Sequence, residues 1–447
     1  MKAIDIKDIN YIAFTLGVEY KNDTGSKIAL KIGRTWLYGI GSYVYHFFYY
    51  LFNGAWNYPF NTNHFDSLYF GISINNENAL NNIRAYDRTY FCVLNKRKYP
   101  FIKAYLKSLL HVGDFVRVIK NSSTYDKEII KANFLDFILA YGNYGVCLEI
   151  IKQIQPKIVI IANDHSIENS CLIRACLDEN VRVLYVQHAS VTTNFPPLRV
   201  DYAFLDGKES YEKYFCIGQI FSTCFITGAV RFDGIKTKAL SSSLQVVGVA
   251  INQFDSIKKI ESLVIKLKNN GYRVVLRPHP AMDLLYYQDF CLRLDLGFSN
   301  PRQEKSYDFL LRIDCLISNQ SSIHLDASIV HCDSVCYNMS DSSVEDYYGY
   351  TSKGLIKNFD DLDDLICALK SNSIKNSNNT DIVRYYNAST GTKYEGKIGL
   401  LIADFINDYV NKGQYDDFVN KYNLNYDSVN NKYEYSPVAF CENEINN

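Results

Sequence analysis

Residues 158–188 read IVIIANDHSIENSCLIRACLDENVRVLYVQH, and this stretch decides the fold. It begins with the apolar run 158–162, which is typical of a strand buried on both faces of a parallel sheet. A helical pattern over residues 167–178 follows, and a second buried run comes at 181–186. Strand, loop, helix and strand in this order form a βαβ unit, so the sequence predicts a doubly wound α/β sheet.

The same alternation extends in both directions. Upstream, helices are expected at residues 128–141 and 146–155. Downstream of the serine run 241–243, a second series predicts a helix at 256–270 and strands at 244–251, 272–276, 314–317 and 334–337. We therefore expect two Rossmann-like domains facing a central cleft, residues 1–240 and 241–410, followed by a weakly ordered tail, residues 411–447.

Charge and cysteine content exclude several classes of protein. The 447 residues carry 47 basic and 48 acidic side chains, and a net charge of -1 argues against broad binding to nucleic acid. The 12 cysteines are scattered without the paired spacing of a zinc site, which indicates free thiols in a reducing cytoplasm. The cysteine spacing also leads us to expect that the protein binds no metal. The N-terminus is too charged for a secretory signal, so we expect a cytoplasmic protein.

Residues 35–65 contain no Asp, Glu, Lys or Arg, and residues 36–52 read WLYGIGSYVYHFFYYLF. Three interpretations are open: a membrane span, an interfacial or partner-binding surface, and a buried core or cleft wall. Glycine, serine, histidine and asparagine interrupt the segment, and tyrosine is typical of interfaces rather than bilayer centres. These features favour a buried wall, with peripheral membrane association through residues 36–60 as the alternative.

Polar residues gather where the strands of the second domain end, which is where ligands bind in open α/β sheets. The loop Arg277-Pro-His-Pro280 is stiffened by two prolines and can present Arg277 and His279 to a phosphate. Paired serines at the start of a helix offer hydroxyls and backbone N–H groups to an anion, although they can also be mere caps. The predicted donor-binding set is Arg277, His279, Pro280, Ser321, Ser322, Asn252, Gln253 and Asp255.

In the first domain, Asp164, His165 and His188 follow the two buried strands. A carboxylate beside imidazoles suits removal of a proton from a sugar hydroxyl. The alternative is that Asp164 caps the helix that starts near Ser166 and that His188 is a satisfied core residue. Motifs of other enzyme classes are missing from the sequence: it has no P-loop, no Gly-x-Gly-x-x-Gly after a strand and no Gly-x-Ser-x-Gly elbow.

Five motifs follow one another along the chain: Tyr185-Val-Gln-His188, Asp201-Tyr-Ala-Phe-Leu-Asp-Gly207, Thr227-Gly-Ala-Val-Arg-Phe-Asp233, Arg277-Pro-His-Pro280 and Ser318-Asn-Gln-Ser-Ser322 with Asp326. Their order resembles bacterial surface-polysaccharide glycosyltransferases of the GT-B fold, over about residues 155 to 340. This group includes sialyltransferases, polysialyltransferases, capsule Kdo transferases and CDP-glycerol glycerophosphotransferases. The resemblance implies that His279-Pro280 and Ser321-Ser322 bind the CMP moiety of a donor. Two departures are the lack of a first acid before Asp206 and Ala189 in place of the usual Gly.

Residues and resemblance together predict an inverting glycosyltransferase that needs no cofactor or metal. It would move an ulosonic acid, sialic-acid-like or Kdo-like, from a CMP donor to a capsule, O-antigen or lipooligosaccharide glycan. Asp164 would act as general base, oriented by His165 or replaced by His188. The alternatives are CDP-polyol phosphotransfer and a non-catalytic GT-B-like assembly module.

Overall fold

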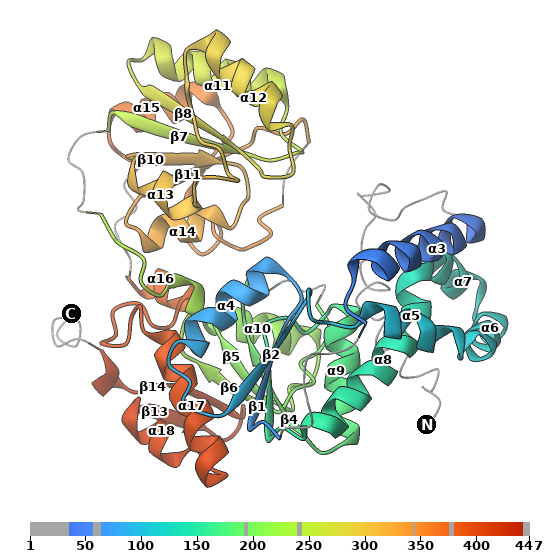
Figure 1. The fold of residues 1–447 in the computed structure, drawn as a ribbon. Helices are drawn as coiled ribbons and strands as arrows, with labels where there is room; N and C mark the ends of the chain where they lie inside the picture. Colours follow the sequence, from blue (N-terminus) through green and yellow to red (C-terminus); the bar gives the residue numbers. More distant parts are fainter. Residues whose placement is uncertain are drawn as a thin grey trace. The chain divides into compact units, whose positions relative to one another are not determined.

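The computed structural model describes residues 35–56, 64–191, 195–238, 244–342, 345–374 and 380–440. The chain forms two compact units (Figure 1), one of residues 1–233 with 392–447 and one of residues 234–391. This division differs from the expected one, because residues 392–410 and the expected tail return to the first unit.

The first unit contains an eight-stranded sheet, sheet A, in the order β13-β14-β6-β5-β4-β3-β1-β2. All neighbouring strands are parallel except the terminal pair of β13 and β14. The strand order reverses between β1 and β3, which is where the ligand crevice of such sheets lies. The strands are β1 Ser67–Gly71, β2 Phe91–Asn95, β3 Ile158–Ile161, β4 Arg182–Val186, β5 Tyr202–Leu205, β6 Thr223–Ile226, β13 Leu424–Asp427 and β14 Lys432–Tyr435.

The C-terminal segment is part of this sheet, so the expectation of a weakly ordered tail is wrong for residues 411–440. Helix α17 (Ile398–Lys412) buries Phe405 in the core of sheet A, and α18 (Asp416–Lys421) buries Phe418 beside it. Tyr433 of β14 stacks on Phe225 of β6 with ring centroids 4.9 Å apart. Aromatic side chains therefore supply the apolar contacts that a Leu- or Val-rich segment would normally provide.

Seven further helices in the described part of the first unit surround the sheet or extend from it. They are α4 Ile74–Arg84, α5 Phe101–Leu109, α6 Val112–Asn121, α7 Thr124–Ala132, α8 Phe134–Ile154, α9 Ile167–Asp178 and α10 Lys208–Ile217. Helix α8 runs through the break expected at residues 142–145. Among the described residues, α8 is the one helix long and apolar enough to cross a membrane, and 72% of its apolar window is buried within the protein.

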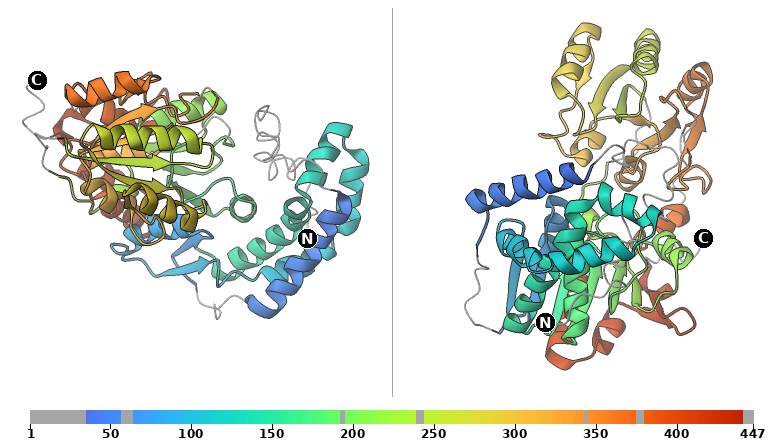
Figure 2. Two further views of the ribbon diagram at one scale, coloured as in Figure 1. Left: turned by 90° about the horizontal axis from the view of Figure 1, so that it is seen from above. Right: turned by 90° about the vertical axis from the view of Figure 1, so that its right-hand side faces the viewer.

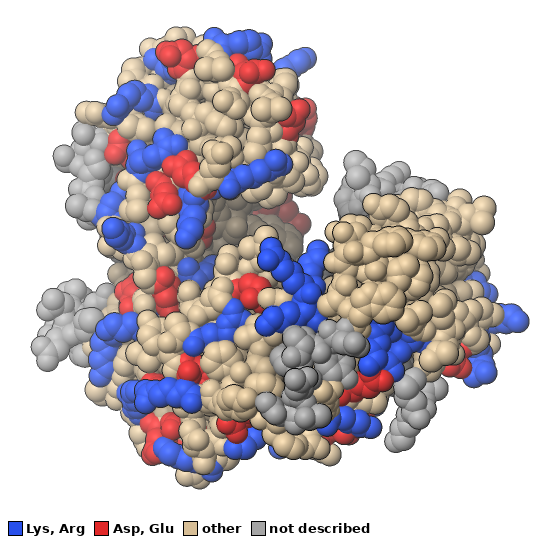
Figure 3. Space-filling view, in the orientation of Figure 1, with Lys and Arg blue, Asp and Glu red and all other residues tan. Residues whose placement is uncertain are grey.

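Residues of the charge-free segment form helix α3 (Trp36–Asn53), which lies against α5, α7 and α8 (Figures 1 and 2). Only Gly39 and Tyr43 of this helix are buried. Its outer side is a continuous uncharged surface in Figure 3. The expected buried wall is thus wrong, because one side of α3 packs and the other side stays exposed.

The second unit contains a six-stranded parallel sheet, sheet B, in the order β12-β11-β10-β7-β8-β9. Numbered within the unit, this is the 3-2-1-4-5-6 order of a dinucleotide-type Rossmann sheet, and its crevice lies between β7 and β10. Two Rossmann-like units in one chain confirm the predicted α/β fold class of GT-B type. The strands are β7 Val246–Ile251, β8 Arg273–Pro278, β9 Gly297–Phe298, β10 Cys315–Ser318, β11 Asp333–Tyr337 and β12 Lys357–Phe359, and the helices are α11 Ile257–Asn269, α12 Leu284–Leu294, α13 Ser306–Leu311, α14 Ile323–Ile329, α15 Leu362–Lys370 and α16 Thr380–Tyr386.

Candidate functional site

The two loops at the crevice of sheet B are held together by Asp255. Its carboxylate accepts hydrogen bonds from the Asn252 backbone N–H at 2.7 Å and from Asn319 Nδ2 at 3.0 Å. Asn319 Nδ2 also donates to Ser340 Oγ at 2.8 Å. Burial raises the pKa of Asp255, and these hydrogen bonds oppose the rise. Asn252 and Asp255 therefore shape the loops from within, while Gln253 between them is exposed.

Ser322, His279 and Pro280 present exposed surface at this edge, and Ser321 is half-buried. Ser322 precedes α14 without making a side-chain cap. His279 follows β8, the neighbour of β7, and its Nδ1 accepts the Ala281 N–H at 3.2 Å. That bond leaves Nε2 available, and no contact to it is present in the part of the chain that the structure describes. The hydroxyls follow β10 and the imidazole follows β8, the two strands that flank β7, so these groups lie at the same edge of sheet B, where open α/β sheets bind ligands.

Arg277 does not play the part expected of it. Its guanidinium is buried beside Phe309 and donates to Ser299 Oγ at 2.7 Å and to the Glu304 carbonyl at 2.9 Å. Burial lowers the pKa of Arg277, and the nearby Glu304 opposes this. These two donors bind the protein itself, so Arg277 braces the loop after β9.

Two residues of this edge were not anticipated from the sequence. Gln320 Oε1 is buried without a hydrogen-bond partner among the described residues, one position before the serine pair. His324 is fully buried, with Nε2 3.0 Å from the Asn319 carbonyl and Nδ1 3.3 Å from Ser334 Oγ. Burial lowers the pKa of His324 to about 4, so it is neutral at physiological pH. The sequence signal that could have identified both residues is their position on either side of a Ser-Ser pair at the end of a strand.

In the first unit, Asp164 follows β3 and is 4% exposed. Its Oδ2 accepts the Tyr214 hydroxyl at 2.8 Å, and its Oδ1 lies 3.0 Å from His165 Nδ1. Helix α9 is capped by the Ser166 side chain. The alternative in which Asp164 serves as a helix cap is therefore wrong, and the carboxylate is instead paired with an imidazole.

His188 follows β4, the neighbour of β3 in sheet A. Its Nδ1 is buried and has no hydrogen-bond partner among the described residues. Burial, with a smaller contribution from the neighbouring His165, lowers the pKa of His188 to about 4. It is thus a neutral imidazole with an unsatisfied nitrogen, which differs from the satisfied core residue that the alternative required.

A buried ion pair lies at the end of β5. Asp206 Oδ2 lies 2.5 Å from Arg231 Nη1, and the Asp206 backbone N–H donates to Gln187 Oε1 at 3.0 Å. Burial raises the pKa of Asp206 to about 6 despite the arginine. Tyr214 and Arg231 come from segments far along the chain, and no local sequence signal marks either as a partner.

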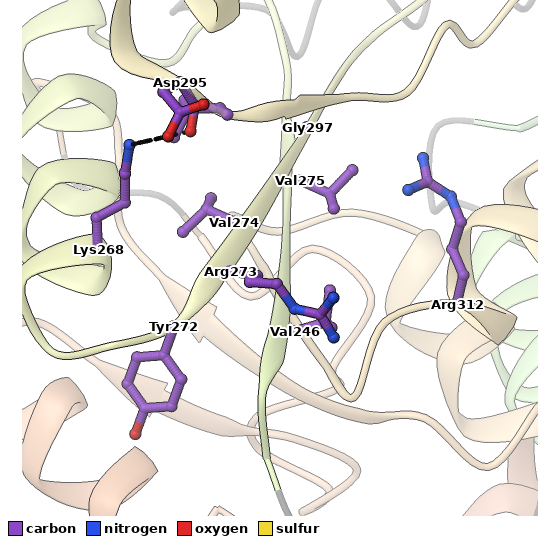
Figure 4. Close-up of a pocket in the computed structure, with 10 residues that line it drawn as sticks. Val246, Lys268, Tyr272, Arg273, Val274, Val275, Asp295, Gly297 and Arg312 are labelled. Atoms are coloured by element: carbon purple, nitrogen blue, oxygen red, sulfur yellow. Dashed lines mark hydrogen bonds and ion pairs between the residues drawn. The ribbon is translucent and has the colours of Figure 1, made fainter.

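A hollow of the second unit lies at the other edge of sheet B, where the strands begin (Figure 4). Its volume is about 560 Å³, and Arg273 and Arg312 reach into it while Lys268 pairs with Asp295 at its rim. Parallel sheets bind ligands at the opposite edge, where the loops described above lie. In the described residues, no three His, Cys, Asp or Glu side chains converge as a metal site.

Comparison with known proteins finds no matching family model and no matching curated protein. Among solved structures, the UDP-GlcNAc 2-epimerase from Neisseria meningitidis bound to UDP-GlcNAc is similar over 72% of this chain and 96% of its own, with 11% identity and a TM-score of 0.48. A variant of the wall teichoic acid polymerase TagF soaked with CDPG is similar over 78% of this chain and 89% of its own, with 12% identity and a TM-score of 0.45. MurG from Acinetobacter baumannii is similar over 78% of this chain and 100% of its own, with 10% identity and a TM-score of 0.44.

Proposed function

We propose that this protein is an inverting glycosyltransferase that moves an ulosonic acid from a CMP donor to a hydroxyl of a bacterial surface glycan. It would act in the cytoplasm, at the inner face of the membrane, without a metal or other cofactor. The observation that carries the proposal is the pairing of buried Asp164 with His165 at the carboxyl end of β3. A pair of this kind is suited to removing a proton from an acceptor hydroxyl.

We infer different roles for the two members of the pair from their exposure. The His165 side chain is 26% exposed and that of Asp164 only 4%. Because the carboxylate accepts the Nδ1 proton, the ring keeps Nε2 as its proton acceptor. His165 would therefore act as the general base, and Asp164, which was expected to be the base, would position it.

The reaction follows from these roles. The acceptor hydroxyl gives its proton to His165 Nε2 while its oxygen attacks the anomeric carbon of the donor. The bond from that carbon to the phosphate oxygen breaks, and CMP leaves with the electron pair. The hydroxyls of Ser321 and Ser322 and the ring of His279 would stabilise the charge that develops on the CMP phosphate.

A second candidate, CDP-polyol phosphotransfer, is favoured by the unpartnered Nδ1 of His188. A neutral imidazole with a free nitrogen can remove the proton of a hydroxyl that attacks phosphorus. The two candidates differ in the required imidazole and in the donor. A single set of donors and variants therefore separates them.

The experiment combines ligand binding with turnover. Melting temperatures are measured with CMP, CDP, UDP and GDP, with and without EDTA, because a ligand that binds only the native state raises the melting temperature. CMP-activated sialic acid and Kdo and a CDP-polyol are then tried with wild type, His165→Asn, His188→Asn and, as a control, the exposed His331→Asn.

The proposal expects a CMP shift that survives EDTA and at least a hundredfold loss of turnover in His165→Asn, in line with typical general-base contributions. A shift with CDP alone, together with loss only in His188→Asn, would establish phosphotransfer instead. A shift with UDP or GDP contradicts both candidates. No shift and no turnover with any donor would identify a non-catalytic module.

A further inference from the structure

Helix α3 presents a continuous apolar face to solvent. Leu37 and Phe52, near its two ends, are each 80% exposed, and Tyr45 between them is 66% exposed. The other members of this outer face are Tyr38, Ile40, Val44, Phe48 and Tyr49. The corresponding surface in Figure 3 shows no charged side chain. An apolar area of this extent marks a site of interaction rather than an ordinary exposed surface.

The inner face of α3 is firmly packed, so the exposure does not come from a loose helix. The Tyr43 hydroxyl lies 2.7 Å from the Tyr105 carbonyl and 2.8 Å from Ser108 Oγ. Tyr50 stacks on Phe101 with ring centroids 4.5 Å apart. Helix α3 is therefore held on α5 and presents its outer side chains as a fixed surface.

A cationic triplet precedes α5, the helix on which α3 packs. Lys96, Arg97 and Lys98 are all exposed, and they end three residues before Phe101, on which Tyr50 of α3 stacks. No ion pair joins these three side chains to a carboxylate in the described ranges, and the charge of Lys96 acts at longer range on Glu168, where it opposes the rise in pKa that burial causes. The stretch 35–56 contributes no charge of its own. An aromatic, uncharged helix near exposed cations is complementary to a surface that has an apolar interior and an anionic outer layer.

We propose that the outer face of α3 and the triplet Lys96-Arg97-Lys98 form a docking surface for an anionic lipid bilayer. The 18-residue helix lies in the plane of the interface, with Phe48 and Phe52 among the acyl chains and the triplet at the phosphate headgroups. The tyrosines lie at the level where their rings meet the lipid and their hydroxyls meet water. This inference does not depend on the proposed reaction.

The test is sedimentation of the full-length protein with vesicles of phosphatidylcholine alone and of phosphatidylcholine with 30% phosphatidylglycerol. Wild type is compared with Phe48→Glu/Phe52→Glu and with Lys96→Ala/Arg97→Ala/Lys98→Ala. Controls are Phe221→Glu, which is 75% exposed elsewhere on the first unit, and Lys258→Ala/Arg273→Ala/Lys370→Ala, which removes three exposed positive charges from the second unit. Circular dichroism melting verifies that every variant is folded.

Wild type and both controls are expected to bind the anionic vesicles. The triplet variant should bind them at least about tenfold more weakly and lose most of the salt dependence, and the Phe48/Phe52 variant should lose binding to both vesicle types. The proposal is overturned if wild type binds neither vesicle, or if the Phe48/Phe52 variant binds like wild type. A wild-type dimer that Phe48→Glu/Phe52→Glu dissociates, without vesicle binding, would assign the face to a second copy of the chain. Nucleotide shifts serve as an independent readout, so failure here is distinct from failure of the glycosyltransferase proposal.

Discussion

Asp233 and Gly399 are joined by a hydrogen bond of 2.6 Å from the Gly399 backbone N–H to Asp233 Oδ2. The other carboxylate oxygen of Asp233 accepts the Ile398 N–H at 2.9 Å. These are first-turn N–H groups of α17, which have no partner within the helix. Asp233 is the last residue of the first unit before the chain enters the second, and α17 follows soon after the chain returns. The carboxylate thus ties the outgoing and the returning chain together.

Asp233→Ala should lower the free energy of unfolding of the first unit by about 1–2 kcal/mol, the usual cost of losing a helix cap. Asp233→Asn, which keeps one acceptor oxygen, should cost less. Urea unfolding monitored by tyrosine fluorescence measures both. An unchanged Asp233→Ala protein would show that water replaces the carboxylate without cost.

Gly142 lies where α8 crosses α5 most closely. A Cβ atom there would come 1.8 Å from the Ala104 carbonyl oxygen, whereas a Cβ at Gly113 of α6 would meet nothing within 4 Å. Gly142→Ala should therefore destabilise the protein by about 1–3 kcal/mol through overpacking. Gly113→Ala should stabilise it by about 0.5–1 kcal/mol, because alanine loses less entropy in a helix. Equal effects of the two substitutions on the melting temperature would contradict the close crossing.

Substitutions of Arg277 and His279 should have different effects, the first on stability and the second on ligand binding. Arg277→Met removes the hydrogen bonds to Ser299 and Glu304 and should cost about 2–3 kcal/mol of unfolding free energy. His279→Ala removes an exposed side chain and should change stability by less than about 0.5 kcal/mol. It should nevertheless abolish the melting shift produced by CMP. The assignment of His279 to the donor site fails if this variant binds CMP like wild type.

Buried His324 predicts a loss of stability in mild acid. Its pKa is lowered from 6.5 to about 4 by burial, so its stabilising effect is complete above pH 6.5 and is lost as the pH falls towards 4. The full loss is on the order of 3 kcal/mol. His188 acts in the same direction, whereas Asp206, whose pKa is raised to about 6, favours the folded state more at low pH.

Melting temperatures of wild type and His324→Gln between pH 7 and pH 4 test this prediction. The variant should lose less stability over the interval, because glutamine has no proton to gain. Parallel curves for the two proteins would show that His324 does not titrate in this window.

The sequence predicts the parts of the fold that depend on neighbours along the chain. The helix expected at residues 167–178 is α9, and the run at 181–186 is β4 within one residue. The hairpin of β13 and β14 was missed because β14 pairs with β6, about two hundred residues upstream, and its aromatic residues among many asparagines resemble a loop. The break expected at residues 142–145 was wrong, because Gly142 and Gly145 leave room for α5 to pack closely against α8 and do not end the helix.

One part of the candidate site could likewise be predicted from the sequence, and another part could not. Strand ends locate Asp164 and His165, and adjacency in the sequence brings them together, so they could be predicted. Which of them is the base depends on burial, which the sequence does not reveal. The contact of Tyr214 with Asp164 requires α10 to pack over the end of β3, and the role of Arg277 requires Ser299 and Glu304 to surround it.

The return of the chain to sheet A has a consequence for biosynthesis. All six strands of sheet B are encoded before α17, β14 and β13, which complete sheet A. A ribosome making this protein therefore exposes every strand of the second unit while the first unit still lacks its last helices and an edge of its sheet. The second unit can fold first as an autonomous insertion, and the first must wait with Phe204 and Phe225 uncovered until Phe405 and Phe418 emerge.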